Sequence, residues 1–375
     1  MKENPLLKLQ SFGQSIWLDY IQRRLIDSGE LQRLIEEDGL SGMTSNPDIF
    51  EKAIEGSHDY DNAIRALALQ GKSVEEIYDT LTVEDVVRAA DLFRPTHDRL
   101  LGRDGFVSLE VNPHLARDIH GTVAEARRLW AALDRPNVFI KVPATLEGLQ
   151  SIRQLISEGI NVNVTLLFGL PRYQQVADAY ISGLETRAAK GLPIEGVASV
   201  ASFFLSRIDV LVDPLLEKII EKKGAEAPIA TGLRGQTAIA SAKVAYRIYK
   251  EVFGSGRFRA LSALGARPQR VLWASTGTKN PEYSDVKYVE ALIGPETINT
   301  VPPETLKAYR DHGDPAPRIE EHLEEAALNL ERLSELGIDL DEVTQKLEDQ
   351  GIEKFNRPYD SLMANLEKKR TAALG

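Results

Sequence analysis

One lysine of this chain stands in a strongly apolar segment. Lys141 belongs to Val138–Pro143, with the sequence VFIKVP, which is typical of a buried strand. Burial disfavours the charged ammonium and favours the neutral amine, which is the form that attacks a ketone to make an imine. A buried lysine can also pair with a carboxylate for a structural purpose alone. Taken by itself, Lys141 is consistent with either role.

Further polar residues interrupt or close other apolar segments. Asp19 follows Trp17-Leu18, and Glu110 lies within residues 107–112. A carboxylate beside an amine can move protons while a carbon–carbon bond breaks, so both acids are candidate partners of Lys141. Singly, each polar residue could be an ordinary hydrogen-bonding group. Their shared place near the ends of strand-like segments nevertheless predicts one common site, with Asn46, Thr165, Ser202 and Ser275 as its neutral members.

Eight segments of strand length alternate with helix-like patterns along the chain. Between them, helices are indicated by amphipathic stretches such as the one that Pro171 opens. This alternation predicts a parallel sheet with helices outside, and eight repeats favour a closed (β/α)8 TIM barrel over an open doubly wound sheet. Polar residues at strand ends would then meet at the C-terminal rim. The expected strands are residues 15–20, 41–46, 106–112, 138–143, 161–168, 197–204, 270–275 and 297–301.

Helical additions interrupt and follow this repeat. Residues 47–105 and 205–269 read mostly as helices inserted into the barrel. C-terminal helices are expected at about 317–370, one running from Ile319 to a stop near Gly337 and another from Asp341 to about Leu366. We expect these helices to pack on the barrel. Because single β/α barrels cover this length, residues 1–375 are predicted to form one domain.

Composition excludes several classes of function. The net charge of -11 disfavours nucleic acid and acidic membrane surfaces, so a phosphorylated ligand must meet a few local cations. The absence of cysteine excludes disulfides and thiolate metal sites. No apolar run approaches the length that spans a bilayer. We therefore expect a cytoplasmic, unprocessed protein; a homo-oligomer is compatible with the sequence, which does not set the oligomeric state.

Motifs for phosphate loops, dinucleotides and metals are incomplete. Gln70–Ser73 imitates the end of a phosphate loop but lacks its first glycine, and residues 254–256 lack the third glycine of a dinucleotide fingerprint. The histidines include no pair at helical ligand spacing. We therefore expect no metal and no cofactor. The histidines are His58, His97, His114, His120, His312 and His322.

Three signatures together resemble the transaldolase family, in its longer bacterial branch. They are GMTSNP at 42–47, IKVPAT at 140–145 and NVTLLF at 163–168, in the order that the family shows. The resemblance spans nearly all expected strands. It implies a cofactor-free barrel of the non-oxidative pentose phosphate pathway. Such an enzyme transfers a dihydroxyacetone unit from sedoheptulose 7-phosphate or fructose 6-phosphate to glyceraldehyde 3-phosphate or erythrose 4-phosphate.

The resemblance also implies roles for individual residues. Lys141 would form the imine with the ketose carbon, and Asp19 would take the proton of the C4 hydroxyl. Glu110 and Thr165 would hold a water that assists imine formation. Neutral donors that orient the sugar hydroxyls without disturbing the charge of the lysine would be Asn46 and Ser202.

The phosphate end of the expected site departs from the family pattern. Arg207 matches a phosphate-binding arginine, whose forked donors suit phosphate oxygens. Many members carry a second arginine two residues after the serine that matches Ser275, but this chain has Gly277 there. Lys279, in the same glycine-containing loop, could supply that cation instead. Phe204 matches a position that is phenylalanine in transaldolases and tyrosine in related fructose-6-phosphate aldolases.

Two other functions compete with this interpretation. The first is an imine-forming aldolase that releases the three-carbon unit instead of transferring it. The second is a non-catalytic barrel that only binds sugar phosphates. Loss of Lys141 or of both carboxylates would favour the second, and none of these residues is lost.

Overall fold

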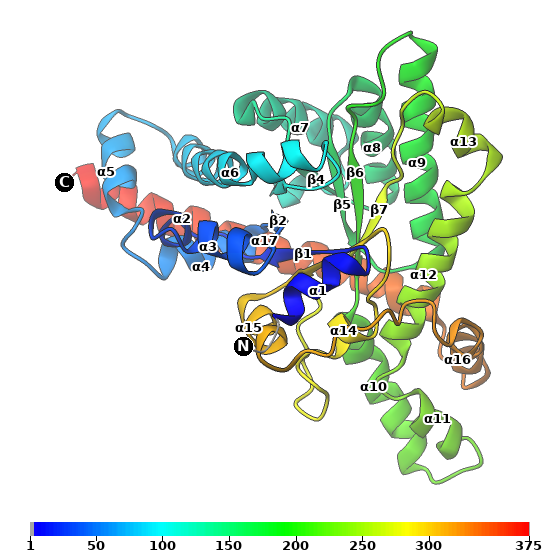
Figure 1. The fold of residues 1–375 in the computed structure, drawn as a ribbon. Helices are drawn as coiled ribbons and strands as arrows, with labels where there is room; N and C mark the ends of the chain where they lie inside the picture. The colour runs from blue at the N-terminus through cyan, green and yellow to red at the C-terminus, as the bar shows by residue number, and fades with distance from the viewer. Residues whose placement is uncertain (1–3, 375) are drawn as a thin grey trace.

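Eight parallel strands close into a barrel in the order of the chain (Figure 1). The computed structural model describes residues 4–374. Since β1 pairs with β8, the predicted barrel is confirmed and the open sheet is wrong. The strands are β1 Gln14–Asp19, β2 Gly42–Thr44, β3 Phe106–Glu110, β4 Val138–Pro143, β5 Val162–Leu167, β6 Ser199–Phe204, β7 Arg270–Ala274 and β8 Thr297–Val301.

The strand register brings candidate residues side by side at the C-terminal ends of the strands. Glu110 of β3 is paired with Lys141 of β4, and Pro143 of β4 with Thr165 of β5. The register between β5 and β6 shifts between Val164 and Leu167. Neighbouring strands therefore place an acid, an amine and a hydroxyl on the same rim.

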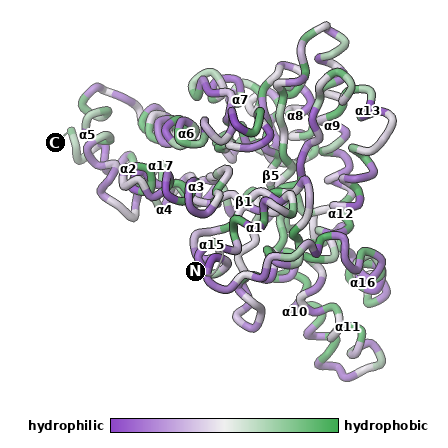
Figure 2. Tube along the Cα trace, in the orientation of Figure 1, coloured by the Kyte–Doolittle hydropathy of each residue, from purple (hydrophilic) through white to green (hydrophobic). Residues whose placement is uncertain are grey.

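Helices cover the outside of the barrel, and several of them begin at a side-chain cap or a proline. Thr145, for example, accepts a hydrogen bond from the N–H of Gly148, and Pro171 lies in the first turn of α9, as predicted. In Figure 2, α6 and α7 alternate between hydrophilic and hydrophobic residues, as expected of helices with one face on a core. α1 Pro5–Ser11 precedes β1, and α15 Pro303–His312 follows β8. The shorter connections between strands contain α2 Arg23–Asp27, α3 Glu30–Glu37, α7 Ile119–Leu133, α8 Leu146–Glu158, α9 Leu170–Ala189 and α14 Lys287–Glu290, with a 3-10 turn at Pro113–Leu115.

The two long insertions are helical, as predicted. The incomplete phosphate-loop motif forms a turn at Gly71, followed by Ser73, which caps α6. The incomplete dinucleotide motif lies at the start of α13, where Gly254 and Gly256 flank its cap, Ser255. The first insertion contains α4 Pro47–Glu55, α5 Asp61–Leu69 and α6 Val74–Arg99; the second contains α10 Ser206–Glu221, α11 Ala227–Leu233, α12 Thr237–Phe253 and α13 Gly256–Ser262.

The C-terminal helices differ in extent from the prediction. The first, α16, begins at Leu323 and ends at Glu335, because Ile319 lies in the preceding segment, where its N–H bonds to the carbonyl of Ile293. The second, α17, runs from Leu340 to Leu374 and is longer than expected. It crosses the molecule and packs against α4 and α5 (Figure 1). None of the helices in the described part of the chain is long and apolar enough to cross a membrane.

Candidate active site

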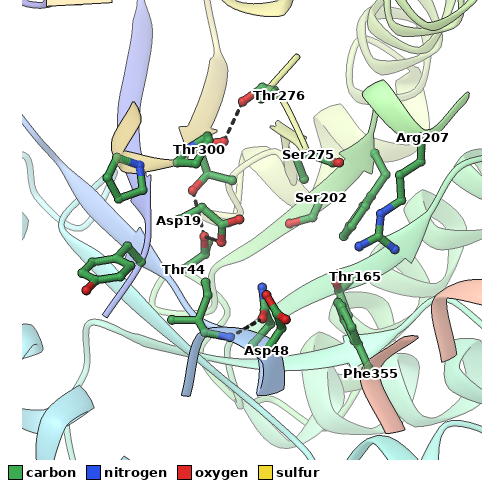
Figure 3. Close-up of a pocket in the computed structure, with 18 of the residues that line it drawn as sticks. Asp19, Thr44, Asp48, Thr165, Ser202, Arg207, Ser275, Thr276, Thr300 and Phe355 are labelled. Carbon is green, nitrogen blue, oxygen red and sulfur yellow. Dashed lines mark hydrogen bonds between the residues drawn. The ribbon is translucent and has the colours of Figure 1, made fainter. Parts of the chain in front are cut away.

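The C-terminal ends of the strands surround a cavity of about 380 Å³ (Figure 3). All of the predicted site residues line it except Glu110, which is buried and pairs with Lys141. Figure 3 shows Asp19 and Arg207 on opposite sides, with Ser202 between them. The predicted residues on the cavity wall are Asp19, Asn46, Lys141, Thr165, Ser202, Phe204, Arg207, Ser275 and Lys279.

Lys141 is held by a carbonyl and a carboxylate. Its Nζ donates to the backbone oxygen of Ser45 at 2.8 Å and lies 3.1 Å from Oε2 of Glu110. The side chains of Lys141 and Glu110 are 5% and 3% exposed. Burial raises the pKa of Glu110, while the charge of Lys141 opposes that rise. The buried amine therefore lies directly beside a buried carboxylate, within reach of proton transfer.

Asp19 ends β1 on the facing wall. Its Oδ1 accepts a 2.6 Å hydrogen bond from Oγ1 of Thr44, which lies 2.8 Å from Oγ1 of Thr300 on β8. Burial raises the pKa of Asp19 above its usual range, and the charge of Lys141 and the bond from Thr44 act against that rise. A carboxylate with a raised pKa is a stronger base near neutral pH, as proton abstraction requires.

Among the neutral residues, the hydroxyl of Ser202 already has a hydrogen-bond partner in the protein, whereas that of Thr165 does not. Ser202 donates to Oδ1 of Asn163 at 2.7 Å, and Asn163 donates to Ser108 at 3.0 Å, so the Ser202 hydroxyl is oriented. Oγ1 of Thr165 and Oε1 of Glu110 are buried without a hydrogen-bond partner within residues 4–374. These two oxygens are therefore free to bind a small polar molecule.

Asn46 does not end a strand, contrary to expectation. The strand β2 stops at Thr44, and Asn46 caps α4, since its Oδ1 accepts from the N–H of Ile49 at 3.0 Å. The physical reason is Pro47, which favours the first position of a helix and leaves the preceding residue as its cap. This cap uses the carbonyl oxygen of Asn46, so its amide N–H groups remain able to donate into the cavity.

Arg207 occupies the other end of the cavity, in the first turn of α10. Its guanidinium carbon lies 5.6 Å from the ring centre of Phe204 and 6.0 Å from that of Phe355. Burial lowers the pKa of Arg207, and its Nη1 is buried without a partner in the described part of the chain. A guanidinium with an unused buried N–H donor can bind an anion.

The loop after β7 forms the rest of this end. Ser275 has a φ of 54° and its Oγ lies 3.0 Å from Oγ of Ser206. Lys279 lines the cavity and its charge acts to lower the pKa of Asp19. Gly277 packs close to Pro302, because a Cβ at this position would meet Cγ of Pro302 at 3.0 Å.

Sequence reasoning missed several residues of the cavity. Thr44 and Thr300 stand near the ends of expected strands, so the rim argument could have found them. Asn163 does not line the cavity but orients Ser202, and only the register that pairs it with Lys141 across β4 and β5 reveals its place. Phe355 reaches the cavity from α17, and no local pattern indicates this. Within residues 4–374, no group of three or more histidine and acidic side chains could hold a metal ion.

Comparison with known proteins agrees with this geometry. The family described as Transaldolase/Fructose-6-phosphate aldolase matches residues 16–366. A transaldolase of Trichodesmium erythraeum is 48% identical over 373 residues, covering 98% of each chain. A transaldolase of Thiobacillus denitrificans is 48% identical over 94% of this chain and 97% of its own, and a "Transaldolase 2" of Nostoc punctiforme is 46% identical over 98% of each. The chain therefore belongs to the transaldolase/fructose-6-phosphate aldolase family.

Proposed function

We propose that this protein is a transaldolase that transfers a dihydroxyacetone unit between sugar phosphates through an imine on Lys141. The observation that carries the proposal is the arrangement of one cavity: a buried amine 3.1 Å from a carboxylate, a second carboxylate opposite, and an arginine with an unused donor at the far end. The ketose would be sedoheptulose 7-phosphate or fructose 6-phosphate, and the aldose glyceraldehyde 3-phosphate or erythrose 4-phosphate.

The first half-reaction builds and then cleaves the imine. The neutral amine of Lys141 attacks the ketose C2 carbonyl, and the resulting carbinolamine loses water. A water held by Glu110 and Thr165 carries the protons of this step, since both residues have buried unpaired oxygens. Asp19 then takes the C4 hydroxyl proton and the C3–C4 bond breaks. The electron pair of that bond moves into the protonated imine to leave an enamine on Lys141, and C4 departs as the aldehyde carbon of an aldose phosphate.

The second half-reaction reverses these steps with a new aldehyde. The enamine carbon attacks the aldose carbonyl, and Asp19 returns its proton to the new hydroxyl. Hydrolysis of the imine then frees Lys141 and the product. Asp19 must act as a base in one half and as an acid in the other, and a pKa raised toward neutrality suits both.

The remaining polar residues hold the substrate. Asn46 and Ser202 bind sugar hydroxyls from opposite walls. Arg207 binds the phosphate with charge-assisted bonds, assisted by Ser275 and by Lys279 in place of a second arginine. The single-domain organisation over residues 1–375 and the cytoplasmic location remain predictions from the sequence, which is compatible with a homo-oligomer but does not set the oligomeric state.

The family also contains aldolases, which release free dihydroxyacetone, and Phe204 favours transfer. Its ring is 7% exposed, packs 5.1 Å from Phe168 and faces Arg207. An apolar ring cannot hold the water that hydrolyses the intermediate, as a tyrosine hydroxyl could. The enzyme-bound unit therefore waits for an aldose.

Mass spectrometry after borohydride reduction tests the proposal. With fructose 6-phosphate, reduction should add one dihydroxyacetone-sized group, located on Lys141, because it freezes the imine. Lys141→Arg keeps the charge and loses the nucleophile, so it should fold, remain unlabelled and be inactive. An adduct on another lysine, or none during turnover, would remove the mechanism.

A further inference from the structure

We infer that Phe355, carried by the C-terminal helix α17, is a positioning residue that fixes the Arg207 guanidinium for the substrate phosphate. This inference rests on the proposed role of Arg207 and extends it to a part of the chain outside the barrel repeat. It makes α17 a determinant of specificity for phosphorylated sugars.

The first step of the argument is the place of Phe355. It lines the cavity, is 4% exposed, and its ring centre lies 5.9 Å from Nζ of Lys141 and 6.0 Å from Cζ of Arg207. Figure 3 shows Phe355 entering from α17 beside Thr165, on the same side of the cavity as Arg207. One ring thus borders both the nucleophile and the proposed phosphate cation.

The second step concerns what holds the guanidinium in place. Phe204 lies 5.6 Å from Cζ of Arg207, so the cation contacts two rings from different parts of the chain. Nη1 of Arg207 has no hydrogen-bond partner within residues 4–374. Ring contacts can orient the planar guanidinium without consuming its N–H donors, which leaves them for phosphate oxygens.

The third step is the rigidity of the helix. Before Phe355, Glu348 pairs at 3.1 Å with Arg172, which lies in the first turn of α9. After Phe355, the hydroxyl of Tyr359 accepts at 3.2 Å from Asn112, which follows β3. Both anchors belong to segments that follow barrel strands. Phe355 is therefore held over the rim by contacts on either side.

Removing the Phe355 ring is expected to lower kcat/KM mainly for substrates that carry a phosphate. A cation–ring contact changes an equilibrium by a few-fold when it is exposed and by about thirtyfold when it is desolvated, so a factor of about three to thirty is expected here. Phe355→Ala should lower kcat/KM for fructose 6-phosphate by this factor, mainly through a higher KM. Unphosphorylated fructose should be affected much less, because Arg207 contributes little to its binding.

The experiment compares the two donors with D-glyceraldehyde as the common acceptor, so that the acceptor carries no phosphate. Phe355→Tyr should restore the preference for fructose 6-phosphate and Phe355→Leu should not, because only the first keeps a ring. Leu362→Ala is the matched control, since Leu362 is fully buried on the same helix but does not line the cavity. It should leave the donor preference unchanged, whatever its effect on thermal stability.

A double-mutant cycle with Arg207→Ala completes the test. In that background Phe355→Ala should have no further effect on the donor preference. The inference is overturned if Phe355→Ala lowers kcat/KM equally for both donors, or if its effect on the donor preference persists without Arg207. It is also overturned if Leu362→Ala changes the donor preference as strongly as Phe355→Ala does. If Arg207→Ala itself leaves the donor preference unchanged, the phosphate assignment in the proposed function is wrong instead. Should Phe355→Ala not fold, the Tyr and Leu variants decide.

Discussion

The hydrogen bond from Thr44 to Asp19 is expected to set the acid limit of activity. Burial raises the pKa of Asp19, and the 2.6 Å bond from Thr44 is among the effects that hold it down. Thr44→Val keeps nearly the same shape and removes the donor. The pKa of Asp19 should therefore rise further, so that the base becomes protonated at a higher pH.

The size of this shift follows from the kind of bond that is lost. A hydrogen bond to an ionised group contributes about 1.5 to 3 kcal/mol, and about 1.4 kcal/mol corresponds to one pKa unit. The acid limb of kcat/KM should therefore move upward by about one to two pH units. Activity on the plateau at higher pH should fall much less, since Asp19 is ionised there in both proteins.

The assay is a pH profile of kcat/KM for fructose 6-phosphate with erythrose 4-phosphate. Thr44→Ser retains the hydroxyl and should keep the parent profile. Thr276→Val removes a hydroxyl from the same cavity that bonds to the carbonyl of Thr300 rather than to Asp19, and it should leave the limb in place. An active Thr44→Val enzyme with an unmoved acid limb would refute the reasoning.

Four further outcomes are expected. Phe204→Tyr should raise release of free dihydroxyacetone relative to transfer, as chromatography of both products would show; equal ratios in parent and variant would contradict this. Activity should survive prolonged chelation, and a loss reversed only by a divalent ion would refute it. Asp19→Asn should abolish activity yet raise the melting temperature by a few degrees at neutral pH. Because the pKa of Asp19 is higher in the folded state than in the unfolded state, the folded state binds more protons between these two pKa values, and the stability of the parent protein is lost as pH rises through that window. The difference in melting temperature between variant and parent should therefore vanish in acid. Arg23→Ala should lower the free energy of unfolding, measured in urea, by roughly 3–5 kcal/mol. The fully buried carboxylate of Asp85 lies 2.9 Å from Nε of Arg23 and would lose its charge partner. A change below about 1 kcal/mol would contradict this.

The barrel could be predicted because its signals are local. Val138–Pro143 and Thr297–Val301 were bounded correctly, since short apolar, β-branched runs stop at clear breaks. The strand pattern continues past the start of α4, so it does not reveal that Asn46 is the cap of that helix. The cavity residues of the rim followed from the rule that barrel sites form at strand ends.

Contacts between distant segments could not be predicted in this way. The amphipathic pattern of the last helix shows which face is buried but not what it is buried against, so the position of Phe355 stayed hidden. The rim rule could have indicated Thr44 and Thr300 singly, but not the contact between their hydroxyls, which joins β2 to β8 where the barrel closes. Such pairings depend on the closed topology, which no single stretch of sequence contains.

That junction ties the chemistry of Asp19 to the order of folding. Asp19 lies on β1 and is held by Thr44, whose hydroxyl meets that of Thr300, a residue 256 positions later in the chain. Bringing such distant segments together has a large entropic cost and is slow compared with forming local helices. During refolding, helical signal should therefore return before turnover does. The rate at which catalytic activity recovers would then report the rate at which the first and last strands pair.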